Sequence, residues 1–146
     1  MKTLKEIAES ILTRPLKKED GLTFSEIEEI ETDLGIKLPN ILREFYSLVG
    51  GLDMLFINSF ECFIKPYIKN GMLVFLEENE GLCYWGVKMQ KLSNSQLNVY
   101  MCTDVEQNNT EWVSEEVTLD GFLSMLLYYQ AASGGYEYSG AISETE

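Results

Sequence analysis

The sequence predicts an α+β fold in which a mostly antiparallel sheet packs with N-terminal helices and one C-terminal helix. Apolar residues recur at helical spacing in the first 50 residues and again near residues 119–130, while strand-like runs fill the middle. Helices and strands that occupy separate runs favour an α+β arrangement over alternating βαβ units. We expect residues 1–146 to form a single domain, because a chain of this length buries roughly 70% of its unfolded surface. Residues 133–146, rich in Gly, Ser and Glu, are expected to be a partly frayed tail.

The first predicted helix covers residues 3–12. Thr3 and Glu6 have the spacing of a capping box at its start, and Pro15 follows its end. Its apolar residues recur at i, i+3, i+4, i+7 and i+8, namely Leu4, Ile7, Ala8, Ile11 and Leu12.

Two further helices are predicted before residue 50. One runs from Phe24 to Leu34 behind a second capping box of Thr23 and Glu26, and Gly35 provides its stop. Its apolar stripe is expected to comprise Phe24, Ile27, Ile30 and Leu34, with a solvated acidic face of Glu28, Glu29, Glu31 and Asp33. The other begins with Pro39 and ends near Val49, after which Gly50-Gly51 would allow a left-handed exit.

The middle of the chain predicts strands, and the last apolar run predicts a helix. Residues 78–81 are expected to form a hairpin loop, because Asn and Gly tolerate unusual φ values. Thr118 is placed to cap the closing helix, which extends to about Gln130 with Met125, Leu127 and Tyr129 widening its apolar stripe. The strand candidates are residues 55–57, 62–64, 72–77, 82–88, 97–103 and 112–113.

The charge of the chain bears on its partners. There are 24 acidic and 11 basic residues, so the formal charge is −13, yet the first 20 residues carry five basic and four acidic groups. The acidity therefore belongs to the body of the chain. Such a field repels phosphate backbones and attracts a basic protein, so we expect a basic protein partner and no direct binding of nucleic acid. Net charge also serves solubility alone in many proteins.

Histidine is absent, which removes Ser-His-Asp and Cys-His catalysis and the HExxH zinc helix. Cys62, Cys83 and Cys102 match no zinc spacing and lie in apolar runs, so buried reduced thiols are expected. We therefore expect that the chain is not an enzyme and that it binds no metal ion or cofactor. A secretory leader and a stretch of about 20 apolar residues are both lacking, so a cytoplasmic protein without membrane contact is expected.

The first candidate contact surface is the acidic hairpin of Glu77, Glu78, Asn79 and Glu80. Three carboxylates within four residues repel one another, and a basic partner would relieve that repulsion. A solvated turn explains the same pattern without any partner. A third hypothesis is that the chain is an enzyme that uses this cluster or a Cys, since paired carboxylates can perform acid–base chemistry.

A second acidic segment, residues 104–115, has part of the spacing of a calcium loop. Asp104, Glu106 and Asn108 fall at positions 1, 3 and 5, and Glu115 falls at position 12. Asn109 stands where such loops have Gly, and a strand precedes the segment, so metal binding is not expected. Asp104, Glu106, Glu115 and Glu116 remain candidate partner contacts.

Trp85 and Trp112 are candidate interface anchors, because Trp is enriched at binding hot spots. Both lie in apolar, strand-like runs, which favours packing in the core instead.

Three segments in a fixed order resemble the SUKH superfamily, whose members include yeast cell-wall-assembly regulators and bacterial toxin-immunity proteins. They are EIEEIETDLGIKLPNILREFYSLVGGLD (residues 26–53), VFLEENEGLCYWGV (residues 74–87), and Trp112 followed by LDGFLSMLLYYQA (residues 119–131). The resemblance implies helices packed around an antiparallel sheet and a binding module without catalysis. It also implies an immunity protein that covers a toxin, often a nuclease, or alternatively a regulatory scaffold that binds a cellular protein. Two departures are Glu80, where related sequences often have Gln, and the lack of prolines in residues 94–100.

Overall fold

The computed structural model describes residues 2–52, 61–78, 83–92, 96–103 and 111–132. Its helices are α1 (Leu4–Leu12), α2 (Phe24–Leu34), α3 (Asn40–Val49) and α5 (Leu119–Ala132), with 3-10 turns η1 (Lys18–Asp20) and η2 (Met89–Lys91). Its strands are β1 (Glu61–Lys69), β2 (Met72–Glu78), β3 (Tyr84–Lys88), β4 (Asn98–Cys102) and β5 (Val113–Thr118).

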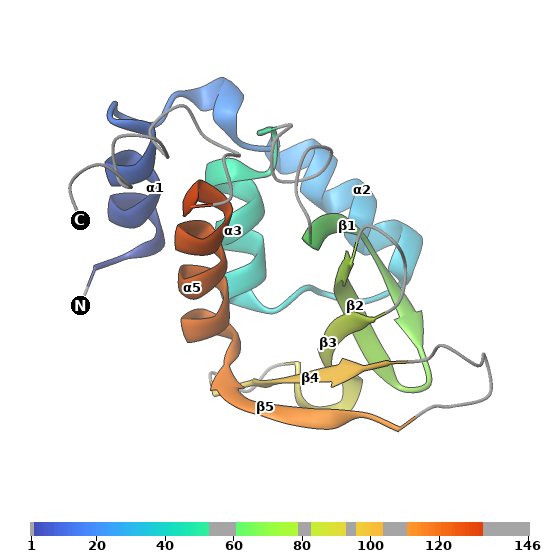
Figure 1. Ribbon diagram of the computed structural model, residues 1–146. Coiled ribbons are helices and arrows are strands. Elements are labelled where there is room, and N and C mark those ends of the chain that lie inside the picture. The colour runs from blue at the N-terminus through green and yellow to red at the C-terminus, as the bar shows by residue number, and fades with distance from the viewer. Residues whose placement is uncertain (1, 53–60, 79–82, 93–95, 104–110, 133–146) are drawn as a thin grey trace.

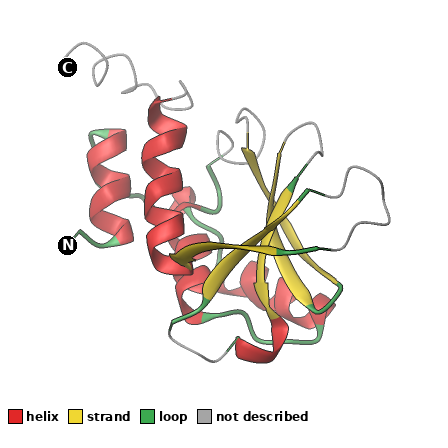
Figure 2. Cartoon of the chain, turned by 60° about the horizontal axis from the view of Figure 1, so that its bottom comes forward, coloured by secondary structure: helices red, strands yellow, loops and turns green. Residues whose placement is uncertain are grey.

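The five strands form one sheet in the order β1-β2-β3-β4-β5, and every neighbouring pair is antiparallel. Each strand therefore pairs with the next one along the chain, and β1 and β5 are the two edges of the sheet that the described residues form. Figure 1 shows α3 and α5 between this sheet and α1, and Figure 2 shows the twist of the sheet. The predicted α+β class, the antiparallel sheet and the closing helix are confirmed.

Local signals at the helix ends act as predicted. The Thr3 hydroxyl accepts from the Glu6 backbone N–H at 3.1 Å, and the Glu6 carboxylate accepts from the Thr3 N–H at 2.9 Å. Thr23 and Glu26 form the same capping box at the start of α2. Gly35 ends α2 at φ 72°, a left-handed conformation that costs glycine little.

The main core lies between the helices and one face of the sheet. Apolar side chains from α1, α2, α3 and α5 meet those of β2, β3 and β4, and the fully buried ones include Phe45, Phe75 and Leu123. α1, α3 and α5 pack against one another, while α2 packs against α3 and β1 (Figure 1). A smaller cluster of Val74, Tyr84 and Cys102 lies on the other face of the sheet, packed by Tyr67 and Trp112.

The expected division of α2 into an apolar and an acidic face is wrong at two positions. Phe24 is 65% exposed, because the core-facing stripe begins one turn later at Ile27. Glu31 is only 5% exposed and accepts a 2.8 Å hydrogen bond from the backbone N–H of Leu38. The guanidinium of Arg43 lies 3.3 Å from the same carboxylate. Glu31 therefore joins α2 to the start of α3 and does not face solvent.

Gly50 and Gly51 do not provide the expected left-handed exit from α3. Gly50 has φ −64°, and the positive-φ glycines among the described residues are Gly35 and Gly71. A Cβ on Gly50 would lie 2.6 Å from the Tyr46 carbonyl oxygen, and one on Gly51 would lie 2.9 Å from the Glu19 carbonyl oxygen. Close backbone approach, not handedness, requires glycine here.

An ion pair stabilises the segment that connects α1 to α2. Arg14 donates to both carboxylate oxygens of Asp20 at 2.8 and 3.0 Å, and the Lys17 backbone N–H donates at 2.7 Å. Asp20 is 6% exposed, so these donors satisfy a buried charge. The hydrogen bonds from Arg14 lower the pKa of the Asp20 carboxyl more than burial raises it.

The last strand is longer than predicted. The sequence indicated only residues 112–113, whereas β5 runs from Val113 to Thr118. Its pairing with β4 shifts between Ser114 and Thr118, and Glu116 adopts φ 58° inside that irregularity. A β-bulge of this kind twists an edge strand and re-aims its side chains.

Candidate binding surface

The strand register places the strand ends that flank both predicted acidic segments at one end of the sheet. Glu77, near the end of β2, pairs with Tyr84 at the start of β3, and Tyr84 pairs with Cys102 at the end of β4. β5 begins at this same end with Val113. The connections between β2 and β3 and between β4 and β5 therefore leave the sheet from the same end.

Much of the predicted contact surface falls outside the part of the chain that the structure describes. This applies to Asn79, Glu80, Asp104 and Glu106, and to the side chain of Glu78, the last residue of β2. The predicted strand at residues 55–57 and the tail at 133–146 also lie outside it. These predictions stay predictions, while Glu77, Glu115 and Glu116 can be placed.

Glu77 is half-buried and pairs with Tyr84, a member of the smaller cluster. The Tyr67 hydroxyl donates a 2.8 Å hydrogen bond to its carboxylate. Burial raises the pKa of the Tyr67 hydroxyl, and this bond to a carboxylate raises it further. Lys69 donates to the Tyr84 hydroxyl at 2.7 Å nearby. Glu77 is thus held by a side chain of its own sheet, so it differs from the solvated carboxylate that a simple turn would present.

Glu115 lies on the opposite face of the sheet. Trp85 directly follows Tyr84 in β3, and successive side chains of a strand point to opposite faces. The Trp85 indole Nε1–H donates a 2.9 Å hydrogen bond to Oε2 of Glu115. The register therefore places Glu77 and Glu115, which are both candidate partner contacts, on opposite faces of the sheet.

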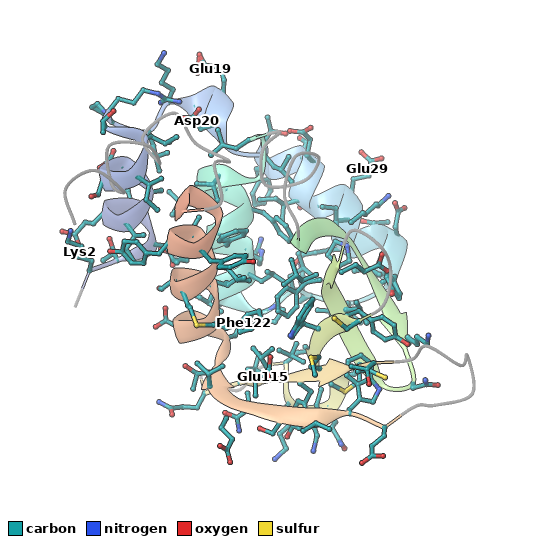
Figure 3. All side chains as sticks on the ribbon, viewed as in Figure 1. Lys2, Glu19, Asp20, Glu29, Glu115 and Phe122 are labelled. Atoms are coloured by element: carbon teal, nitrogen blue, oxygen red, sulfur yellow. The ribbon has the colours of Figure 1, made fainter. Side chains whose placement is uncertain are left out.

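A small pocket opens beside Glu115 between the sheet and α5. We call it the Glu115 pocket; its volume is about 240 Å³ and its lining comprises Leu76, Trp85, Glu115, Phe122, Met125, Leu126 and Tyr129. Figure 3 shows Glu115 and Phe122 where β5 leads into α5. Apart from one carboxylate, the walls are apolar or aromatic.

The expectation that Met125 and Tyr129 widen the core stripe of α5 is wrong. Met125 is 53% exposed and Tyr129 is 43% exposed, while Leu127 is buried as predicted. The reason is geometric: Leu123 and Leu127 already face the core, and Met125 and Tyr129 lie at the pocket side of the helix. The i, i+4 spacing of Met125 and Tyr129 was the available signal for this surface.

Glu116 is exposed and lies within the β5 bulge, where its backbone N–H donates to the Ser114 hydroxyl at 3.0 Å. The calcium-loop spacing has no helical context, because the segment lies between strands β4 and β5. Within the described ranges, no group of three or more metal-ligating side chains comes together.

The two tryptophans lie in different environments. Trp85 is buried at 8% exposure and packs against Phe122, with ring centroids 6.4 Å apart. Trp112 is half-buried on the other face, edge-on to Tyr84 at 5.4 Å. Core packing is thus confirmed for Trp85, and Trp112 covers the smaller cluster. Among the cysteines, Cys102 is buried as expected, whereas Cys83 is only half-buried.

A larger groove of about 730 Å³ lies between the α2–α3 connection, η2 and the start of α5. Its volume is in the range of small-molecule sites. The ionisable residues of its lining are Lys37, Glu44 and Asp120. None of the residues singled out from the sequence as candidate contacts lines this groove.

Several exposed carboxylates have no ion-pair partner within the described part of the chain: Glu28, Glu29, Glu115, Glu116 and Asp120. By contrast, Lys65 pairs with Asp33 at 3.0 Å, and Arg14 and Arg43 pair with buried carboxylates. The described surface therefore has unneutralised negative charge. None of the helices in the described ranges is both long and apolar enough to cross a membrane.

A comparison with known protein families gives a match. Neither the curated proteins nor the solved structures include a match to the chain. Residues 21–127 match the model of the SMI1 / KNR4 family (SUKH-1), a range that runs from the start of α2 through the sheet and into α5. Because the match covers more than half of the sequence, the chain belongs to the SMI1 / KNR4 family, SUKH-1.

Proposed function

We propose that this chain is a protein-binding module, and more specifically a bacterial immunity protein that neutralises a cognate toxin without catalysing a reaction. The observation that carries the proposal is membership of the SUKH-1 family. The formal charge of −13 supports it independently, because it favours a basic macromolecular partner.

A nuclease toxin fits this charge best. An enzyme that binds phosphate backbones needs a basic active-site surface, which an acidic protein can cover. The unpaired carboxylates, among them Glu115 and Glu116, would contribute to such an interface. In this proposal the end of the sheet that connects β2 to β3 and β4 to β5 provides the remaining contacts, including Glu78, Asn79, Glu80, Asp104 and Glu106.

Coexpression with the product of the neighbouring gene tests the proposal. If that product is a toxin, growth should be restored by this chain, and the purified proteins should form a complex that weakens as salt concentration rises. Absence of a complex at low ionic strength would refute the proposed function.

The alternative is a regulatory scaffold that binds a cellular protein. The same family membership supports it. A gene neighbourhood without a toxin, together with repeated recovery of one housekeeping protein in pulldowns, would favour this alternative over immunity.

A further inference from the structure

We propose that the Glu115 pocket binds a single basic side chain, lysine or arginine, from the surface of the partner protein. The inference rests on the proposed function, because it assigns one contact within that protein–protein interface. It is carried by the combination of a fixed carboxylate, an apolar cavity and exposed apolar walls at one place.

The carboxylate is held in position before any partner arrives. Oε2 of Glu115 accepts the hydrogen bond from Trp85, whose ring is itself packed against Phe122. Oε1 accepts no hydrogen bond from any side chain or backbone group of the described residues, and Glu115 is exposed. One oxygen therefore fixes the orientation of the group while the other remains open to a ligand, which lowers the entropic cost of binding.

The walls of the pocket suit the stem of a long basic side chain. Met125 is 53% exposed and Tyr129 is 43% exposed, and both line the cavity of about 240 Å³. Lysine and arginine combine an apolar stem with a charged head, so the stem can cover these walls while the head reaches Glu115. A methionine wall adapts to either shape, and aromatic rings also attract cations.

Other occupants fit less well. A purely apolar side chain would desolvate Glu115 without giving it a partner. Residues 133–146 of the chain contain three glutamates and no basic residue, so they cannot supply a cation. A second copy of the chain has the same formal charge of −13 and would be repelled. Charge complementarity therefore selects a basic group from another protein.

The direct test uses small probes on the full chain. N-acetyl-arginine amide and N-acetyl-lysine amide are titrated while the two indole N–H signals are followed by NMR, with N-acetyl-norleucine amide as the neutral probe of similar length. We expect the Trp85 signal to move with millimolar affinity for the basic probes, as suits ligands of this size, and about tenfold more weakly for norleucine. The Trp112 signal, on the other face of the sheet, is the internal reference.

The matched variants are Glu115→Gln and Glu116→Gln, which remove the same charge from neighbouring exposed positions. The amide introduced by Glu115→Gln retains an oxygen for the Trp85 hydrogen bond, so the fold should persist while the response to basic probes is lost. Glu116→Gln should respond as the wild type does. A Trp85 signal that ignores all probes, or that follows norleucine as strongly as arginine, overturns the inference.

The second arm uses the complex with the product of the neighbouring gene. Glu115→Gln should weaken it by about tenfold or more, as expected for a central charged contact. Glu19→Gln, which removes one exposed charge from η1, should weaken it by less than about threefold. If the complex forms but Glu115→Gln leaves it unchanged, the inference fails and the proposed function stands. If wild-type chain forms no complex, the proposed function fails, and the probe titration alone then decides whether the pocket takes a basic side chain.

Discussion

The indole Nε1 of Trp85 donates a 2.9 Å hydrogen bond to Oε2 of Glu115, and this bond spans strand β4. It joins a buried residue of β3 to an exposed residue of the edge strand β5. A buried indole N–H needs an acceptor, and Glu115, which lies in the irregular stretch of β5, provides it. This one hydrogen bond therefore gives the buried indole N–H an acceptor, links the edge strand β5 to β3 and orients a surface carboxylate.

Glu115→Ala should destabilise the protein by about 1–2 kcal/mol, because it leaves the Trp85 N–H buried without a partner. Glu115→Gln should cost less than half of that, since the amide oxygen can still accept the bond. Chemical denaturation monitored by fluorescence gives the free energies of unfolding.

The Trp85 indole N–H resonance provides the structural readout for the same variants. It should move in Glu115→Ala, while the Trp112 resonance stays in place. Equal stability of the alanine and glutamine variants would show that the hydrogen bond contributes little.

Periodicity predicted the fold well because most elements bury one continuous stripe. Both capping boxes, the stop at Gly35 and the closing helix follow from local spacing alone. The Asn70-Gly71 turn was not predicted, although Asn-Gly is a typical two-residue hairpin signal. Both residues have positive φ and connect β1 to β2, and the strand predicted at residues 62–64 stops short of them. The polar sequence of β5 concealed a strand because an edge strand can expose most of its side chains.

The candidate surface was less predictable because it depends on contacts between distant residues. Glu31 looks like its solvated neighbours in sequence, and only its hydrogen bond from Leu38 distinguishes it. Glu77 and Glu115 are both acidic strand residues, but the register places them on opposite faces of the sheet. Neither the hydrogen bond of Glu31 nor the opposite faces of Glu77 and Glu115 can be predicted from residue spacing along the chain.

Asp20→Asn should destabilise the protein by about 1–2 kcal/mol at pH 7, because it removes charge from the hydrogen bonds with Arg14. The pKa of Asp20 is lowered in the folded state, so its stabilising contribution is fully present above the unfolded pKa of about 3.9. That contribution is lost as pH falls through the lowered folded pKa.

Unfolding measured from pH 7 down to about pH 3 should therefore show the gap between wild type and Asp20→Asn closing below about pH 4. Glu19→Gln, a neutralisation at the exposed neighbouring position, is the control and should stay within about 0.5 kcal/mol of wild type at pH 7. A gap that is independent of pH would contradict the role assigned to the Asp20 charge.

Glu31→Ala should cost about 3 kcal/mol, because it leaves the Leu38 N–H without its acceptor and Arg43 without its ion-pair partner. Glu28→Ala removes an exposed carboxylate from the same helix and should change stability by less than about 0.5 kcal/mol. Thermal unfolding of the two variants makes the comparison. Similar losses would mean that Glu31 acts only as part of the charged helix surface.

Gly21→Ala should be among the most damaging alanine substitutions at a glycine, since a Cβ there would overlap the Ser47 carbonyl oxygen. Backbone atoms would have to move, so we expect a loss of at least about 3 kcal/mol. Gly35→Ala is the matched control: its φ of 72° strains alanine, but beyond its chain neighbours and its own helix no atom lies within 4 Å of the added methyl, and the loss should be about 1 kcal/mol. If denaturation midpoints instead show Gly35→Ala to be less stable than Gly21→Ala, conformational strain outweighs steric overlap at these two glycines. The backbone at Gly21 would then have room to move away from α3.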